Sequence, residues 1–312
     1  PQFVFLNGAG GTGKTTTFIN KNYPYSALTF PTNELKADKQ KETRLKCYTH
    51  TNFFQLPVPK KDKKADEDAH GLNDFEYRKI RRVFVDEITM VNKSNLNRMI
   101  KHALKYGYRL YVAGDIDWDT TQPYQLHPVM NKFTMDTSKF HQVMHEKNYR
   151  IKCKKLYKIL SFTRALMKNN FHQKDDVMHQ MNNIIIDAMK DRHITKKEAL
   201  EMYDPEHDII IAPTHQIKDT YNNELLEKHP ENQKVKITIK LKDYEKGTII
   251  YKPHLQSSTK SITPCFSTVI HGVQGKTFDG KLFIHTDRIF EFGMLYTALS
   301  RVRYYDNIYL IK

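Results

Sequence analysis

The sequence predicts an α/β protein with two lobes, each built around a mostly parallel β-sheet. Short apolar runs alternate with helix-like stretches over about the first 130 residues, a spacing typical of parallel strands joined by crossover helices. A second strand–helix series begins near residue 208, after a glycine-free helical stretch at 151–203. A length of 312 residues also suits two domains. We expect residues 1–150 to form the first lobe and residues 151–312 the second.

The first lobe is expected to contain four core strands, each a short apolar run followed by polar or turn-forming residues. These strands are Phe3–Leu6, Ser26–Phe30, Arg82–Val85 and Leu110–Ala113. Residues 57–81 include a lysine-rich run of mixed charge without apolar periodicity, which indicates a solvated insertion and not a core element. His141 and His145 fall in a stretch that we interpret as helical.

The second lobe is expected to begin with the helical stretch and to continue with strands. Its strands are predicted at Asp208–Ala212, Cys265–Ile270, Lys281–His285 and Asn307–Ile311, with a helix at Glu291–Leu299. Apolar and polar residues alternate from Val235 to Ile239, which favours a small antiparallel, strand-rich insertion at about 229–262.

A glycine-rich loop follows the first strand directly. Residues 8–15 read G-A-G-G-T-G-K-T, a complete G-x-x-x-x-G-K-[ST] phosphate-binding pattern. Backbone N–H groups of such a loop, at the positive end of the next helix, bind the phosphates of a nucleoside triphosphate. A lysine charge and a hydroxyl that holds Mg²⁺ complete the site. The predicted triphosphate contacts are Gly8, Gly11, Thr12, Gly13, Lys14, Thr15 and Thr16, with Thr15 on Mg²⁺.

Two acidic residues end the apolar strand at Arg82–Val85. In a parallel sheet this strand end lies beside the phosphate loop. Asp86 is therefore predicted to complete the Mg²⁺ shell, and Glu87 to orient or activate the attacking water. A further strand end, Gly114-Asp115, is a weaker signal that is often only a turn.

Charge and composition narrow the class of partner. The chain carries 50 Lys and Arg against 35 Asp and Glu, a formal net charge of +15, which favours a polyanion. Together with the phosphate loop, this makes nucleic acid the leading candidate. No apolar stretch reaches the roughly 18–20 residues that cross a bilayer, so we expect no membrane segment. Three widely separated cysteines and no signal peptide suggest a reducing intracellular compartment, cytoplasm or nucleus.

Six further motifs occur in an order that resembles superfamily 1 helicases, and the resemblance covers essentially the whole chain. They are Phe30–Asn33, Tyr48–Thr51, Asn148–Arg150, Ala212–His215, Thr268–Thr277 and Tyr296–Arg301. The resemblance implies two RecA-like lobes with ATP and Mg²⁺ in the cleft between them. The form of the motif at 268–277, T-x-x-H-x-x-Q-G-x-T, is closer to the RecD and Dda-like branch, superfamily 1B, which moves 5′→3′.

The same resemblance implies roles for individual residues. Arg150 and Arg301 would be arginine fingers, and Gly275 would lie near the nucleotide. Gln125 is assigned as the γ-phosphate sensor with Gln122 as the alternative, because the family's spacing would place that glutamine at Trp118. The expected nucleic-acid contacts are Thr32, Asn33, Thr49, His50, Thr268 and His271. Phe53 or Phe54, and Trp118 or Tyr124, are the candidates for base stacking.

The function expected from the resemblance is ATP-dependent movement on single-stranded nucleic acid, with strand separation. DNA is favoured and RNA is retained, since viral RNA helicases of superfamily 1 share much of this motif vocabulary. Two alternatives stay open: a viral-type RNA helicase, and a nucleic-acid-binding scaffold whose ATP site only controls affinity. We expect a monomeric core that can be part of a longer protein. Base selectivity among triphosphates stays open.

Overall fold

The computed structural model describes residues 2–57, 72–125, 133–170, 175–238, 246–252, 262–289 and 291–312. These residues divide into two compact units. The first unit consists mainly of residues 2–123 and 133–148, and the second mainly of residues 149–238, 249–252 and 262–312. Each unit is described separately below.

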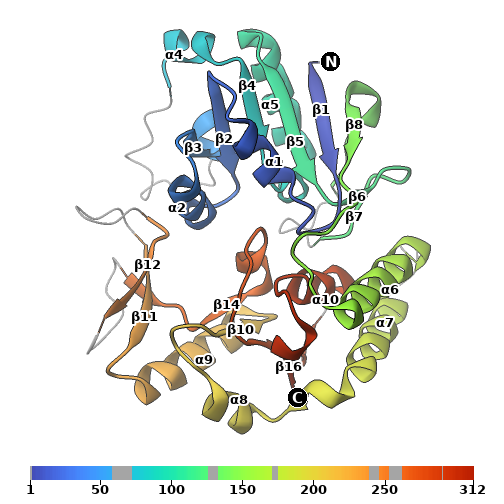
Figure 1. Cartoon of the computed structure of the whole chain (residues 1–312), viewed down its shortest axis with the longest axis vertical. Helices are drawn as coiled ribbons and strands as arrows, with labels where there is room; N and C mark the ends of the chain where they lie inside the picture. The colour runs from blue at the N-terminus through green and yellow to red at the C-terminus, as the bar shows by residue number, and fades with distance from the viewer. Residues whose placement is uncertain are drawn as a thin grey trace. The chain divides into compact units, whose positions relative to one another are not determined.

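The first unit is built on a six-stranded, entirely parallel sheet in the order β3-β2-β4-β5-β1-β8 (Figure 1). Its strands are β1 (Phe3–Asn7), β2 (Ser26–Phe30), β3 (Lys46–Thr49), β4 (Arg82–Val85), β5 (Arg109–Gly114) and β8 (His141–Met144). Its helices are α1 (Lys14–Lys21), α2 (Asn33–Glu42), α3 (His50–Phe54), α4 (Asp74–Lys79) and α5 (Lys93–Tyr106). A two-stranded ribbon, β6 (Ile116–Asp117) with β7 (Gln122–Pro123), follows β5.

Both faces of this sheet are buried, because successive side chains of a strand point to opposite faces. Val4 and Leu6 pack with Phe18 of α1 on one face, whereas Phe5 packs with the helices of the other face. Tyr77 of α4 is fully buried on that second face, and its hydroxyl donates to the Phe53 carbonyl oxygen at 2.5 Å. Helices on both faces of a parallel sheet confirm the predicted α/β class.

Two sequence predictions for this unit need correction. The stretch with His141 and His145 is strand β8 and the residue after it, not a helix, because its backbone pairs with β1. The excursion predicted at 57–81 also extended too far. Residues 72–81 contain α4, whose Tyr77 belongs to the core. The lysine-rich run at 60–68 lies outside the described residues.

The second unit contains a five-stranded, entirely parallel sheet in the order β14-β10-β15-β16-β9. Its strands are β9 (His193–Ile194), β10 (Ile209–Ala212), β14 (Ser267–Val269), β15 (Leu282–His285) and β16 (Ile308–Ile311). Its helices are α6 (Lys154–Asn170), α7 (Asp175–Ala188), α8 (Lys196–Met202), α9 (His215–Lys228) and α10 (Phe292–Leu299). The four predicted core strands are therefore present, with β9 as an addition at the sheet edge.

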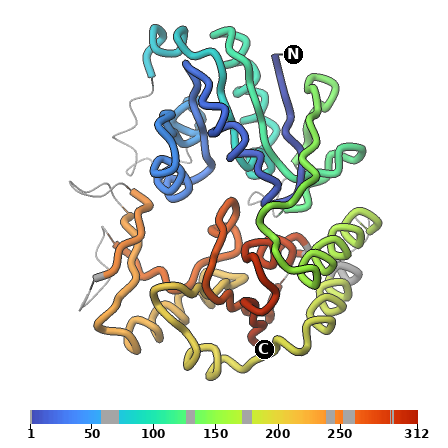
Figure 2. Tube along the Cα trace, viewed as in Figure 1, coloured from blue at the N-terminus to red at the C-terminus, as the bar shows by residue number. Residues whose placement is uncertain are grey.

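Helices cover both faces of the second sheet as well. Helices α6 and α7 lie side by side (Figure 2) and pack with α10 against Ile209 and Ile211. On the opposite face, Ile210 packs with residues of α8 and α9, such as Ala199 and Tyr221. The alternation along β10 thus gives each sheet face its own hydrophobic core.

The strand-rich insertion of the second unit forms an antiparallel sheet in the order β12-β11-β13. These strands are β11 (Gln233–Ile237), β12 (Ile249–Lys252) and β13 (Ile262–Pro264). Residues 239–245 and 253–261 of the insertion lie outside the described residues.

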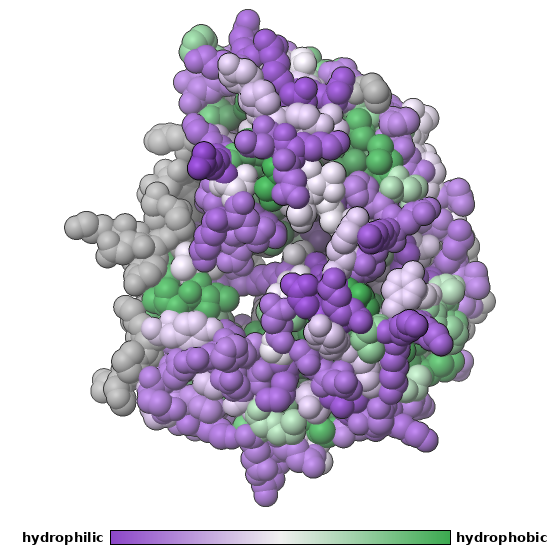
Figure 3. Space-filling model, viewed as in Figure 1, coloured by the Kyte–Doolittle hydropathy of each residue, from purple (hydrophilic) through white to green (hydrophobic). Residues whose placement is uncertain are grey.

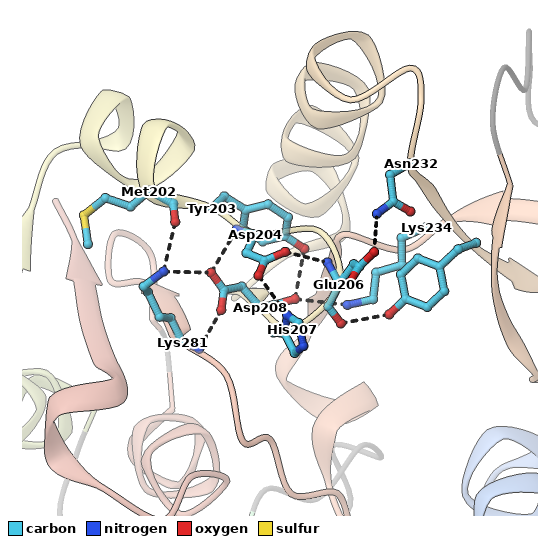
Figure 4. A network of polar contacts seen from close by, with 10 residues as sticks. Met202, Tyr203, Asp204, Glu206, His207, Asp208, Asn232, Lys234 and Lys281 are labelled. Atoms are coloured by element: carbon cyan, nitrogen blue, oxygen red, sulfur yellow. Dashed lines mark hydrogen bonds and ion pairs between the residues drawn. The ribbon is translucent and has the colours of Figure 1, made fainter.

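A polar network joins the start of this insertion to the loop before β10 (Figure 4). The ammonium group of Lys234 donates to the Asp208 carbonyl oxygen at 3.0 Å, and Tyr251 donates to the Glu206 carbonyl oxygen at 3.0 Å. The Asp208 carboxylate, only 2% exposed, accepts hydrogen bonds from the backbone N–H groups of Lys281 and Asp204. The insertion is thus fixed to the second unit by one buried hydrogen bond, from Lys234, and one exposed hydrogen bond, from Tyr251.

Hydrophilic residues cover most of the face of the molecule seen in Figure 3. Within the described residues, none of the helices combines the length and the apolar character that crossing a bilayer would require.

Candidate nucleotide and nucleic-acid site

The glycine-rich loop leaves the carboxyl end of β1 and turns sharply into α1. Gly11 and Gly13 have φ values of +86° and +78°, which L side chains adopt only with strain. A Cβ atom on Gly8 would come within 2.4 Å of the His145 carbonyl oxygen. The Lys14 ammonium group donates to the carbonyl oxygens of Gly8 and Ala9 at 2.7 and 3.1 Å. Lys14 therefore lies over the loop, and the backbone geometry explains why this segment needs glycine.

Thr15, the first hydroxyl of α1, meets the acidic end of β4. Its Oγ1 donates to Oδ2 of Asp86 at 2.9 Å. Burial raises the pKa of Asp86, while the Thr15 hydrogen bond and the nearby Lys14 charge oppose that shift. A hydroxyl beside a carboxylate provides the hard oxygen ligands that Mg²⁺ prefers, and a cation there would hold the carboxylate in its charged form. Thr15 and Asp86 thus fit the Mg²⁺ role that the sequence predicts.

Glu87 follows Asp86 in an unusual backbone conformation. Its φ and ψ are 48° and 50°, in the left-handed region that residues other than glycine rarely adopt. The Glu87 backbone N–H donates to Oδ1 of Asp86 at 3.0 Å, which helps hold this turn. Strain of this kind is often found at functional residues. The turn presents the two acids of the predicted pair one after the other at the sheet edge that carries the phosphate loop.

Asn148 contacts the phosphate loop directly. Its side-chain Nδ2 donates to the Gly10 carbonyl oxygen at 3.0 Å. The sequence motif at 148–150 drew attention to Arg150 and not to this amide, so Asn148 was missed as a candidate. Its position two residues before Arg150 in that motif was the available signal. The side chain ties the end of the first unit to the loop that is predicted to bind phosphates.

In the second unit, the two predicted arginine fingers converge on Ser300. The Arg301 guanidinium donates to the Thr297 carbonyl oxygen at 2.8 Å and to the Ser300 hydroxyl, and Arg301 is fully buried. Nη1 of Arg150 donates to the Ser300 carbonyl oxygen at 3.0 Å. Residues 150 positions apart in sequence therefore lie together at the end of α10.

Gln125, the assigned γ-phosphate sensor, lies in the second unit beside the motif at 268–277. Nε2 of Gln274 donates to Oε1 of Gln125 at 3.1 Å, and both side chains are buried. Gly275, the next residue, has a φ of +81°. Gln122 lies instead on β7, opposite Asp117 of β6. The structure thus pairs Gln125 with Gln274, a residue that sequence reasoning quoted within a motif but did not single out.

Several predicted nucleic-acid contacts stand at the carboxyl ends of strands. Thr32, after β2, caps α2 by accepting from the Leu35 N–H, and Asn33 is the first residue of that helix. Thr49 ends β3 and caps α3 by accepting from the Asn52 N–H. In the second unit, Thr268 lies in β14, and His271 lies in the short 3₁₀ turn Ile270–Val273. Thr16, another predicted phosphate contact, is exposed on α1.

Three of the predicted contacts lie in or against the core instead. Phe53 is 1% exposed and packs against Tyr77 and other rings, so its ring has no free face for a base. His50 is also buried, and this burial lowers the pKa of its imidazole to about 3. Trp118 is half-buried, with its ring 5.4 Å from that of Phe5. We therefore assign Phe53 and His50 to the core and not to nucleic-acid contact. A sequence pattern alone cannot distinguish a core ring from an exposed one.

Of the other stacking candidates, Phe54 and Tyr124 are likewise buried. Phe54 packs against Phe53 with the ring centroids 4.9 Å apart. The guanidinium group of Arg164 lies over the Tyr124 ring at 4.3 Å. These two rings are therefore occupied by protein neighbours.

Comparison with known proteins finds solved structures that are similar to this chain. No protein-family model and no curated protein matches the sequence. Bacteroides Pif1 bound to ssDNA is similar, with a TM-score of 0.71 and 18% identity over 99% of this chain and 88% of that chain. The same protein in complex with ADP-AlF3 and ssDNA has a TM-score of 0.69 and 19% identity over the same shares. Pif1 helicase from Candida albicans has a TM-score of 0.65 and 17% identity over 99% and 90%.

This chain has the fold of the Pif1 helicases. The six-stranded and five-stranded parallel sheets correspond to their two RecA-like lobes. The resemblance to helicases that the motifs suggested is therefore confirmed at the level of the fold.

Proposed function

We propose that this chain is an ATP-hydrolysing helicase that moves 5′→3′ on single-stranded nucleic acid, with DNA as the favoured substrate. In this proposal, Lys14 and the loop amides bind the triphosphate, and Thr15 and Asp86 hold Mg²⁺. The metal would neutralise charge on the phosphates, and Glu87 would orient the attacking water. Arg150 and Arg301 would supply the positive charge that stabilises the transferred phosphoryl group.

The observation that carries the proposal is the hydrogen bond of 2.9 Å between Thr15 and Asp86, two residues that are 71 positions apart in the sequence. It brings the hydroxyl of the phosphate loop to the acidic strand end, as ATP hydrolysis with Mg²⁺ requires. Glu87 stands next to this pair in a strained turn. A scaffold that only binds ATP would have no need for a positioned acid beside the metal ligands, which favours the enzyme.

Nucleic acid as the substrate is supported by two observations of different kinds. The net charge of +15 suits a polyanion, and the partly exposed polar residues Thr32 and Asn33 begin α2 at the carboxyl edge of the first sheet. Bacteroides Pif1, which has the same fold, has been solved bound to ssDNA. We extend that ligand to this chain as part of the proposal.

Unwinding of tailed duplexes tests the proposed function. With ATP and Mg²⁺, we expect strand separation of DNA duplexes that carry a 5′ single-stranded tail, and little separation of those with a 3′ tail. Matched RNA duplexes test the sugar preference in the same assay. A preference for 3′ tails would refute the direction, and ATP hydrolysis that no single strand stimulates would refute the helicase.

A further inference from the structure

An open hollow of 560 Å³ lies on the first unit, at the amino-terminal edge of its sheet. Its lining consists of Gln2, Arg81, Arg82, Gly107 and Arg109. Arg82 and Arg109 are the first residues of β4 and β5. The phosphate loop occupies the other edge, about five residues or roughly 17 Å further along the strands. This hollow therefore has no part in the nucleotide site.

The arginines of the hollow lie close to one another and have no carboxylate partner among the described residues. Arg82 and Arg109 are direct partners in the register of β4 and β5, and like charges at such a pair are destabilising. Among the described residues, no carboxylate forms an ion pair with Arg81, Arg82 or Arg109, and none lines the hollow. Arg82 instead lies over the Tyr23 ring at 4.4 Å, and Arg109 contacts the Tyr111 hydroxyl at 3.4 Å.

An exposed aromatic residue stands beside these arginines. The Tyr25 carbonyl oxygen accepts from the backbone N–H groups of Arg81 and Arg82 at 2.8 and 3.4 Å. Tyr25 is 68% exposed, although its φ of +57° lies in a region that is strained for such a residue. A large ring that is kept in water on a strained backbone contributes little to folding, so its ring is available for a ligand.

We propose that this edge is a second nucleic-acid site, where the arginines bind backbone phosphates and Tyr25 stacks on a base. Guanidinium groups match phosphate oxygens in geometry and charge, and base stacking on an exposed ring is tolerant of sequence. An anion would also offset the repulsion between Arg82 and Arg109. The carbonyl end of α5 beside the hollow attracts cations too, but it accounts for neither the exposed ring nor the open volume. The choice of nucleic acid as the anion rests on the proposed function.

The test compares short and long strands on the double variant Arg81→Ala/Arg109→Ala. A strand of about 8 nucleotides can occupy one groove only, whereas one of about 30 can reach a second site. By fluorescence anisotropy, we expect unchanged affinity for the short strand and about tenfold weaker binding of the long one. The slope of log affinity against log salt should fall by about 1.4, from two lost phosphate contacts on a single strand. The matched control is Lys158→Ala/Lys197→Ala, which removes two exposed charges of α6 and α8.

A second variant tests the stacked base. Tyr25→Asn removes the ring while asparagine tolerates the left-handed backbone. We expect it to weaken the long single strand about fivefold or more, and to leave duplex DNA unaffected, because paired bases are not free to stack. If the arginine variant instead loses affinity only for duplex DNA, the arginines would still be assigned to phosphate binding, and the proposed base stacking on Tyr25 would be refuted.

Two results would overturn the second site. One is that the arginine variant binds the long single strand and duplex DNA with the same affinity and the same salt dependence as the wild-type protein. The other is that the arginine variant loses binding to poly-glutamate, used as an acidic polypeptide probe, but keeps its affinity for nucleic acid. This result would identify an acidic protein as the partner. Stimulation of ATP hydrolysis by the short strand is measured in parallel. If the wild-type protein lacks this stimulation, the proposed function fails, whereas the edge site is judged on binding alone.

Discussion

At the scale of single residues, the chemistry depends on side chains that are held in costly positions. Asp86 is a buried carboxylate, and Glu87 has a left-handed backbone conformation. Each costs folding free energy unless the surroundings compensate. The Thr15 hydroxyl and the Glu87 backbone N–H bind the two oxygens of the Asp86 carboxylate, which provides that compensation. The acidic pair is thus stabilised by the loop that it is proposed to serve.

Replacing Glu87 tests whether it acts in hydrolysis. We expect Glu87→Gln to lower the ATPase rate by about 100-fold or more, because the amide cannot accept a proton from water. ATP binding, measured with a fluorescent analogue, should stay within about twofold, since the phosphate loop and Asp86 are untouched. Equal losses of binding and hydrolysis would instead indicate a role in holding the nucleotide.

His102 of α5 should make stability depend on pH. Burial and the Lys105 charge lower the pKa of its imidazole from 6.5 to about 4, and Nδ1 contacts the Tyr108 hydroxyl at 2.9 Å. Between these two values the unfolded chain binds a proton that the folded chain does not, so the free energy of unfolding should fall as pH drops from 6.5 to 4. Urea titrations of His102→Gln should show a smaller pH dependence. If the free energy of unfolding of this variant depends on pH as steeply as that of the wild-type protein, His102 is not the group responsible.

At the scale of elements, strands that are buried on both faces were predictable, because each is a short apolar run between turn residues. β2 and β4 have the predicted bounds, and β1 extends one residue further. The exceptions are elements whose partners are distant in sequence. β8 is an exposed edge strand, and its sequence H-Q-V-M shows no alternation of apolar and polar residues. α4 has only six residues, so its helical period was too short to recognise, although Asn73 and Glu76 form a capping box.

The cap of α5 offers a quantitative test. Oδ1 of Asn92 accepts from the Asn95 N–H at 2.9 Å, one of the helix N–H groups without an intrahelical partner. Asn92→Ala should lower the free energy of unfolding by about 1 kcal/mol. Asn97→Ala, at an exposed position inside the same helix, is the control and should be neutral or slightly stabilising. Equal effects of the two changes in urea unfolding would argue against the cap.

At the scale of the whole molecule, each unit has its own cores, and a buried polar cluster holds the insertion to the second one. Asp208 is central to that cluster, because its carboxylate accepts from two backbone N–H groups and contacts the Lys281 ammonium group at 3.4 Å. Burial also lowers the pKa of Lys234, which donates to the Asp208 carbonyl oxygen. Hydrogen bonds of this kind are costly to break, because the remaining partners stay buried.

Asp208→Ala should therefore destabilise the second unit by about 3 kcal/mol. Circular dichroism reports on both units, whereas the single tryptophan, Trp118, reports on the first, where it packs against Phe5. We expect the transition followed by circular dichroism to move to lower urea and the tryptophan transition to move less. Asp219→Ala, which removes an exposed ion pair with Lys218, is the control. Similar shifts in both variants would mean that the Asp208 cluster contributes little.

The sequence by itself determined the fold class, the phosphate loop and the acidic strand end, because each depends on residues that are neighbours in the chain. Glycines at Gly11 and Gly13, for example, specify a local turn whatever lies around them. Only the tertiary structure decided which side chains meet across long separations. It joined Arg150 to Ser300, paired Gln125 with Gln274, and placed Phe53 in the core. Burial and contact depend on the packing of the whole unit, which local patterns do not encode.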